Sequence, residues 1–163
     1  MVTTHNTRNI SDTTKYLQLI ETMKSHNIDF YGITETCHPK GMKYKNTYHP
    51  DYTAIWSTRV NRHAGVGLLI HRKWCTYIQN TFTQHDRFLY VDLYFQGHIK
   101  VRIITIYIQA DLKDKQQCLA LHQQIIDLLK SSDKAQFHVL IMGDFNVNLT
   151  EFYRSIQKHN QGR

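Results

Sequence analysis

The most informative polar residues of this sequence follow an apolar run near its C-terminal end. In the segment HVLIMGDFNVNL, Asp144 and Asn146 stand two residues apart, directly after Met142 and Gly143. Residues two apart in a strand point the same way, so both side chains can converge beyond the end of the strand. Open α/β sheets bind ligands at this edge. An ordinary Asx turn that closes the strand would use the same residues.

Two further polar side chains end apolar runs elsewhere in the chain. Glu35 closes the run FYGITE, and Tyr107 stands near the end of RIITIYI. Taken alone, Glu35 could be a solvent-exposed strand end and Tyr107 a core tyrosine. Together with Asp144 and the carboxamides of Asn6 and Asn146, they form a set of hard oxygen ligands without cysteine or histidine in metal-ligand spacing. Such a set favours Mg²⁺ or Mn²⁺ over zinc.

Composition is typical of one soluble domain, which we expect to span residues 1–163. The chain has 163 residues, 41% of them hydrophobic, and a formal net charge of +7. No apolar run approaches the roughly 18 residues that span a bilayer, and the N-terminal segment has no apolar core typical of a secretory signal. Three widely spaced cysteines lack the density of a disulfide scaffold. We therefore expect an intracellular protein that is neither secreted nor membrane-bound.

The basic charge favours a polyanionic partner such as DNA, although a basic surface can also serve solubility alone. Candidate phosphate contacts are four basic residues in two segments, STRVNRHAG and HRKW: Arg59, Arg62, Arg72 and Lys73. The alternative is that these residues belong to solvated basic loops.

Hydrophobic periodicity predicts two helices and several strands. The first helix, in 10–30, has Ser11 or Asp12 as N-cap and Leu17, Ile20 and Met23 on its apolar face. The second helix presents an apolar face at i, i+3, i+4 and i+7. Strands are expected at 28–35, 52–57, 64–71, 87–95, 99–108 and 137–142. Strands that are apolar on both faces imply a covered sheet, and hence a layered α/β or α+β protein with a partly mixed sheet.

Four blocks of the sequence, IDFYGITET, AGVGLLIH, VRIITIYI and LIMGDFNVN, occur in an order that resembles the endonuclease/exonuclease/phosphatase superfamily. Within it, the chain is most similar to the apurinic-type endonuclease domains of non-long-terminal-repeat retrotransposons. The resemblance implies a four-layer α/β/β/α sandwich and Mg²⁺-dependent hydrolysis of phosphate esters. For a retrotransposon protein it also implies DNA as the substrate, a nuclear location, and a reverse transcriptase downstream in the parent protein.

The resemblance also implies roles for single residues. Glu35 matches the metal-binding glutamate, and Asp144 the aspartate that orients or deprotonates the attacking water. Asn146 matches the carboxamide that holds phosphate, and Tyr107 the tyrosine that contacts the scissile phosphate. Asn6 resembles an asparagine of the family's opening block and is expected at the metal.

The chain departs from the family pattern at both ends. No aspartate-histidine block follows Asn146 before the sequence ends at Arg163, and only MVTTHN precedes the opening motif. We therefore expect a nearly absent first strand, a mostly missing second sheet, an exposed inner face of the first sheet, and weak or lost catalysis. Two other functions stay open: a phosphatase of the same fold acting on inositol phosphates or lipids, and a non-catalytic nucleic-acid-binding module.

Overall fold

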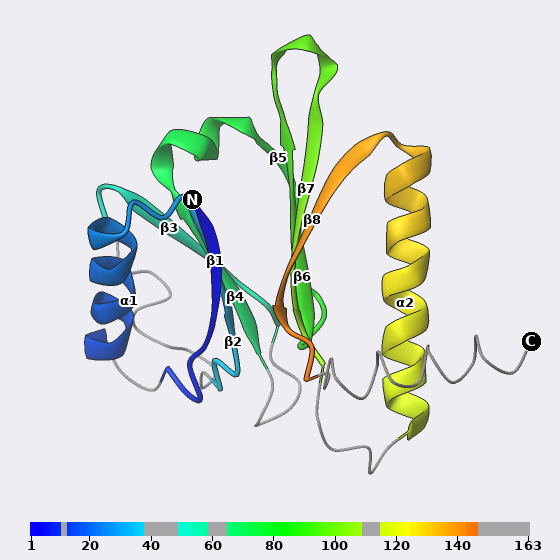
Figure 1. Cartoon of the computed structure of the whole chain (residues 1–163), viewed down its shortest axis with the longest axis horizontal. Helices are drawn as coiled ribbons and strands as arrows, with labels where there is room; N and C mark the ends of the chain where they lie inside the picture. Colours follow the sequence, from blue (N-terminus) through cyan, green and yellow to red (C-terminus); the bar gives the residue numbers. More distant parts are fainter. Residues whose placement is uncertain (11–12, 38–48, 59–64, 109–114, 147–163) are drawn as a thin grey trace, which may run out of the picture.

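The computed structural model describes residues 1–10, 13–37, 49–58, 65–108 and 115–146 of the chain. These residues form two four-stranded sheets, two α-helices and short 3₁₀ turns (Figure 1). In chain order the elements are β1 (Val2–Asn6), α1 (Thr13–Ser25), β2 (Phe30–Thr34), β3 (Tyr52–Trp56), β4 (Val66–His71), η2 (Arg72–Tyr77), β5 (Ile78–Phe82), β6 (Phe88–Tyr94), η3 (Gln96–His98), β7 (Lys100–Tyr107), α2 (Lys115–Lys134) and β8 (Phe137–Asp144).

Each sheet is mixed, with one parallel pair at one edge. The first sheet has the order β1-β2-β4-β3, and the second has the order β5-β6-β7-β8. In the first sheet β1 runs parallel to β2, and in the second β7 runs parallel to β8, while the other pairs are antiparallel. The parallel pairs matter for function because all four of their strands end at the same edge of the molecule.

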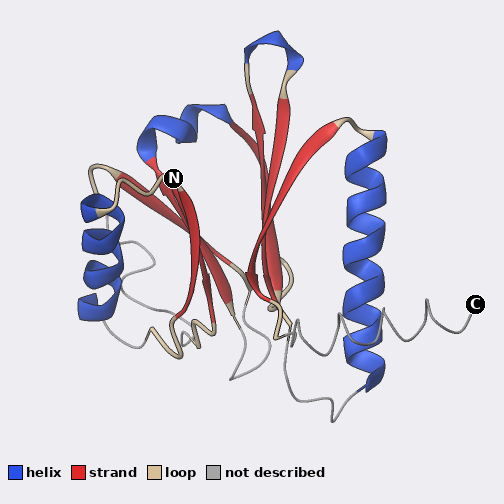
Figure 2. Cartoon of the chain, viewed as in Figure 1, coloured by secondary structure: helices blue, strands red, loops and turns tan. Residues whose placement is uncertain are grey.

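The two sheets face each other, and one helix covers each outer face (Figure 2). Between the sheets, buried side chains of β2 and β4 pack against those of β6, β7 and β8, including Leu68, Leu89 and Met142. A second cluster joins α1 to the outer face of the first sheet, and a third joins α2 to the outer face of the second. The described part of the chain is therefore an α/β/β/α sandwich, as expected from the sequence.

The face of α1 that packs on the sheet is rotated from the expected one. Tyr16, Leu19, Ile20 and Met23 are its buried residues, whereas Leu17 is 49% exposed. Of the expected apolar face, Ile20 and Met23 are confirmed and Leu17 is wrong. The aromatic ring of Tyr16 fills the place against the sheet, because it packs on Trp56 with ring centroids 6.3 Å apart.

Three expectations about missing structure are wrong. The first strand is present, since β1 pairs in parallel register with β2 over all five residues from Val2 to Asn6. The second sheet has four strands, one of which, β5, the periodicity did not predict. The inner face of the first sheet is buried, because the second sheet covers it. The first strand forms in spite of its polar sequence because the neighbouring strand β2 supplies its hydrogen bonds.

The apolar run of β8 is less buried than its composition suggests. Within the described ranges, β8 lies at the edge of the second sheet and pairs there with β7 alone. Consequently Val139 is 36% exposed and Leu140 is 37% exposed, whereas Met142 is buried between the sheets. The strand itself is confirmed, but its expected burial holds only near its C-terminal end.

Candidate active site

The predicted polar residues meet where the two parallel strand pairs, β1–β2 and β7–β8, end. Register places Asn6 of β1 beside Thr34 of β2, one residue before Glu35, and Tyr107 of β7 beside Asp144 of β8. The ends of these strands lie at the lower edge of the sandwich in Figure 1. Residues that are far apart in the sequence therefore share one site.

Asn6 joins the two carboxylates. Its side-chain nitrogen Nδ2 donates to Glu35 Oε1 at 3.0 Å and to Asp144 Oδ2 at 2.9 Å. Its oxygen Oδ1 accepts from the backbone N–H of Arg8 at 3.0 Å. One amide group thus holds a carboxylate from each sheet so that both point at the same atom.

Tyr107 completes this group from the second sheet. Burial, together with a hydrogen bond to Glu35 and the negative charge of that residue, raises the pKa of Tyr107 to about 12. The phenol therefore stays protonated at neutral pH and acts as a donor. The guanidinium carbon of Arg87 lies 5.7 Å from the centre of the Tyr107 ring. Arg87 is not among the residues predicted for the site, although it is the first residue of the strand expected at 87–95.

The segment from Asp144 to Asn146 forms the expected Asx turn and also contributes to the site. Asp144 Oδ1 accepts from the backbone N–H of Asn146 at 3.0 Å, while its other oxygen accepts from Asn6. The side-chain nitrogen of Asn146 donates to the carbonyl of Ile108 at 2.6 Å. An amide nitrogen carries two hydrogens, so one N–H of Asn146 stays available for a ligand. The two explanations of this motif are therefore compatible.

Backbone geometry at the site is unusual. Glu35 and Asn146 have φ angles of 52° and 45°, and Gly143 has a φ of 140°. A Cβ atom at Gly143 would collide with the carbonyl oxygen of Ile106 in the neighbouring strand. Left-handed backbone at non-glycine residues is costly and concentrates at functional sites.

The donor set at this edge fits a magnesium-like ion. Glu35 and Asp144 supply hard oxygen atoms that already converge on one point, and Mg²⁺ in proteins is often held by one or two carboxylates and several waters. Within the described residues, no group of three or more histidine, cysteine, aspartate or glutamate side chains could hold a metal. Of the two carboxylates, Glu35 is the one that would hold the ion, which leaves Asp144 beside it for the attacking water. Asn6 presents its NH₂ group to them, so in this arrangement it orients the two carboxylates, and its expected metal contact stays a prediction.

Of the four basic residues expected to contact phosphate, the two that the structure describes lie away from this site. Arg59 and Arg62 lie outside the described residues. Arg72 and Lys73 belong to η2, which follows β4 at the opposite end of the sandwich. There the Lys73 ammonium pairs with Asp29, and Arg72 Nε donates to the carbonyl of His49 at 2.9 Å.

Comparison with known proteins identifies the family of this chain. The sequence matches the endonuclease/exonuclease/phosphatase family over residues 3–162. This match covers nearly the whole chain, so the chain belongs to that family. None of the curated proteins matches the sequence. Among the described residues, no helix is long and apolar enough to cross a membrane.

Solved structures share the fold at low sequence identity. A 3′–5′ exonuclease from Neisseria meningitidis is similar with a TM-score of 0.67 and 14% identity, over 90% of this chain and 57% of that one. The endonuclease domain of TRAS1, a telomere-specific non-LTR retrotransposon, has a TM-score of 0.56 and 12% identity, over 91% and 61%. TDP2 from D. rerio, complexed with a single-stranded DNA product, has a TM-score of 0.55 and 14% identity, over 81% and 53%. The chain thus spans between 53% and 61% of the length of these structures.

Proposed function

We propose that this chain hydrolyses phosphodiester bonds of DNA with the help of Mg²⁺ or Mn²⁺. The observation that supports this most directly is the convergence of Glu35 and Asp144 on the amide nitrogen of Asn6. Two converging carboxylates attract a divalent cation, and membership of the family makes a phosphate ester the expected substrate. The net charge of +7 supports a polyanion such as DNA over a small phosphate.

Each residue of the site has a role in this proposal. Asp144 orients the attacking water and accepts its proton, and Glu35 holds the metal. Tyr107 and the remaining N–H of Asn146 donate hydrogen bonds to the phosphate oxygens, where negative charge increases in the transition state. When bound, the metal ion acts as a Lewis acid on the phosphate and the leaving oxygen.

We further propose that turnover by this chain is slow. The site, as far as the structure describes it, orients a water and neutralises charge, but no histidine in it contacts Glu35, Tyr107 or Asp144. In this proposal residues 1–163 act as one incomplete domain of the family. The parent protein of this domain is of retrotransposon type and carries a reverse transcriptase. Action on chromosomal DNA would place the protein in the nucleus.

The test is the nicking of supercoiled plasmid DNA by an excess of protein, with Mg²⁺ and with EDTA. One cut relaxes a plasmid, so slow hydrolysis is detectable. We expect slow, Mg²⁺-dependent nicking that Asp144→Ala abolishes. Fast multiple turnover would contradict the proposal that catalysis is weak.

Two other results would assign a different function to this chain. Hydrolysis of inositol phosphates in place of DNA would indicate a phosphatase. DNA binding that is unchanged by EDTA and by Glu35→Ala, without any nicking, would indicate a binding module with an inactive site.

A further inference from the structure

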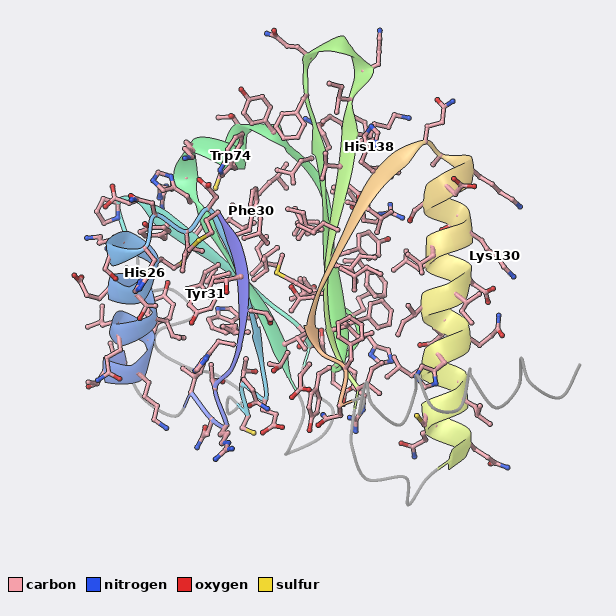
Figure 3. The ribbon with its side chains drawn as sticks, viewed as in Figure 1. His26, Phe30, Tyr31, Trp74, Lys130 and His138 are labelled. Atoms are coloured by element: carbon pink, nitrogen blue, oxygen red, sulfur yellow. The ribbon has the colours of Figure 1, made fainter. Side chains whose placement is uncertain are left out.

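A cavity of about 440 Å³ lies between α1 and the outer face of the first sheet, and we call it the α1 cavity. Side chains of β1, of the segment after β1 and of α1 line it, together with Tyr31 of β2. Tyr31, labelled in Figure 3, belongs to the cluster that joins α1 to this sheet. The volume is within the range of small-molecule sites in proteins.

The α1 cavity and the candidate active site lie on opposite sides of β1. Neighbouring residues of a strand point to opposite faces of the sheet. Asn6 points inward, because its amide bonds to Asp144 of the second sheet. His5 points outward, where its ring lies beside that of Tyr31. The cavity is therefore a separate place on the molecule.

The α1 cavity offers neutral hydrogen-bonding groups. Tyr31 is 5% exposed, and no residue that the structure describes bonds to its hydroxyl. Burial raises the pKa of Tyr31, so the phenol is protonated at neutral pH and can donate. Gln18 of α1 is exposed and adds a side-chain amide to the lining. Among the described residues that line the cavity there is no aspartate or glutamate. These groups suit a neutral ligand better than a cation.

Two aromatic rings favour a flat ligand. The rings of His5 and Tyr31 both line the cavity, with centroids 6.3 Å apart and planes inclined at 47°. Nucleobases stack on aromatic side chains in many proteins, and every base has a flat face for this contact. The amide of Gln18 can donate and accept at the edge of the same base, as glutamine does when it reads bases.

The wall of the α1 cavity beyond β1 has a fixed shape. Asn9 has a φ of 137°, which is costly for a residue other than glycine and persists where the surroundings determine it. The Asn9 carbonyl accepts from the ammonium of Lys15 at 3.1 Å. The next residue, Ile10, is buried, and its backbone N–H donates to the carbonyl of Thr36 at 2.9 Å. The cavity is thus preformed on this side.

We propose that the α1 cavity binds the base of a nucleoside, with the rings of His5 and Tyr31 against the face of the base and the Gln18 amide at its edge. This ligand is distinct from the phosphate ester of the proposed function. A free nucleoside and a nucleic-acid strand both carry such a base, and the experiments below distinguish these two sources.

The first test is a calorimetric titration of residues 1–163 with adenosine. The variants are Gln18→Ala and His5→Ala, and each has a matched control. Gln124→Ala removes an exposed glutamine from the middle of α2, and His138→Ala removes an exposed histidine from β8. Thermal melting shows whether each variant is folded.

We expect adenosine to bind wild type saturably and each cavity variant about tenfold more weakly. Both controls should bind as wild type does. Adenosine monophosphate should bind about as tightly as adenosine, because the base makes the contacts. Much tighter binding of the monophosphate would indicate an anion site and overturn the inference. Absence of saturable adenosine binding, or wild-type affinity in a folded Gln18→Ala, would also overturn it. Plasmid nicking, and with it the proposed function, would be unaffected.

The second test identifies the source of the base. An oligonucleotide of deoxyadenosines is compared with an oligomer of the same length that has an abasic residue at every position, in Ca²⁺ so that binding occurs without cleavage. If Gln18→Ala weakens binding of the first and not of the second, the base belongs to a strand. If it weakens binding of adenosine and of neither oligomer, the ligand is a free nucleoside. Equal losses for both oligomers would place Gln18 on the sugar–phosphate backbone and overturn the inference.

Discussion

The carboxylates at the two ends of the sandwich have different kinds of hydrogen-bond partner. At the end that contains η2, Asp29 accepts from Lys73, from the N-terminal amino group and from Trp74 Nε1. Nearby, Phe30 stacks on Trp74 with ring centres 5.9 Å apart (Figure 3). At the other end, Glu35 and Asp144 accept from amide, phenol and backbone donors within the described part of the chain.

These partners distinguish Asp29, a structural carboxylate, from Glu35 and Asp144, the carboxylates of the candidate active site. Burial alone would raise the pKa of Asp29, but hydrogen bonds from Lys73, the N-terminal amino group and Trp74 outweigh it and hold the pKa well below its ordinary value. Its charge is thus compensated inside the protein. Among the residues that the structure describes, no cation pairs with Glu35 or Asp144 in this way, and a bound metal ion would compensate their charges. Three variants of the site, each with a matched control at the opposite end, and one variant of Asp29 test this comparison.

The largest effect is expected from Asp144→Asn. Loss of the carboxylate removes the group that accepts the proton of the water, so the nicking rate should fall by about 1,000-fold. The measurement is single-turnover nicking of plasmid DNA in Mg²⁺. Asp29→Asn, at the other end, should nick at the wild-type rate. Equal losses in the two variants would show that both carboxylates act only through stability.

Gly143→Ala should destabilise the fold by about 3 kcal/mol, since it combines a strained φ angle with a steric clash. The added Cβ would meet the backbone of β7 at Ile106. Urea unfolding measures this change. Gly97 offers the control, because it also has a positive φ, of 76°, but nothing lies within 4 Å of an added Cβ. Gly97→Ala should cost only about 1 kcal/mol, and similar costs at both glycines would contradict the close approach.

Tyr107→Phe should lower the nicking rate by about 100-fold, because it removes one hydrogen bond to the developing charge. The pKa of Tyr107 is raised to about 12. The hydroxyl therefore remains a donor below that pH, and its ionisation should not reduce the rate up to about pH 10. A pH–rate profile of wild type checks this. Tyr52→Phe, at the start of β3, should leave the rate unchanged.

Asp29→Asn should lower the free energy of unfolding at pH 7 by about 1–2 kcal/mol, because a hydrogen-bonded ion pair is lost. Since the pKa of Asp29 is depressed in the folded protein, its contribution is present above the unfolded pKa of about 3.9 and is lost as the pH falls below it. Urea unfolding of wild type and variant between pH 7 and pH 3 measures the difference. A gap between the two that widens as the pH falls would contradict the ion pair.

Most strands of the fold could be predicted from local pattern. The runs around Gly32, Leu69, Val91 and Ile104 are apolar and branched or aromatic, and each forms a strand of the sandwich. The failures share a cause. β1 and β5 are rich in threonine, asparagine and glutamine, so their strand structure depends on pairing with neighbours, which a local pattern does not contain.

The residues of the candidate site likewise divide into those that the sequence could predict and those that it could not. Glu35, Tyr107, Asp144 and Asn146 could be selected because each stands at the end of an apolar run. The position of Arg87 beside the site could not be predicted, because it depends on contact with the ring of Tyr107 in a neighbouring strand. Arg72 and Lys73 were selected for charge alone, and the fold places them at the other end.

The sequence by itself determined the family, the layered architecture and the residue types at the strand ends, because these depend on short-range spacing and on motifs of a few residues. Only the tertiary structure decided that Asn6 holds one carboxylate from each sheet, and that the charge of Asp29 is paired with Lys73 and the N-terminal amino group. Contacts of this kind join residues far apart in the chain, and their geometry depends on strand register and on how the two sheets pack.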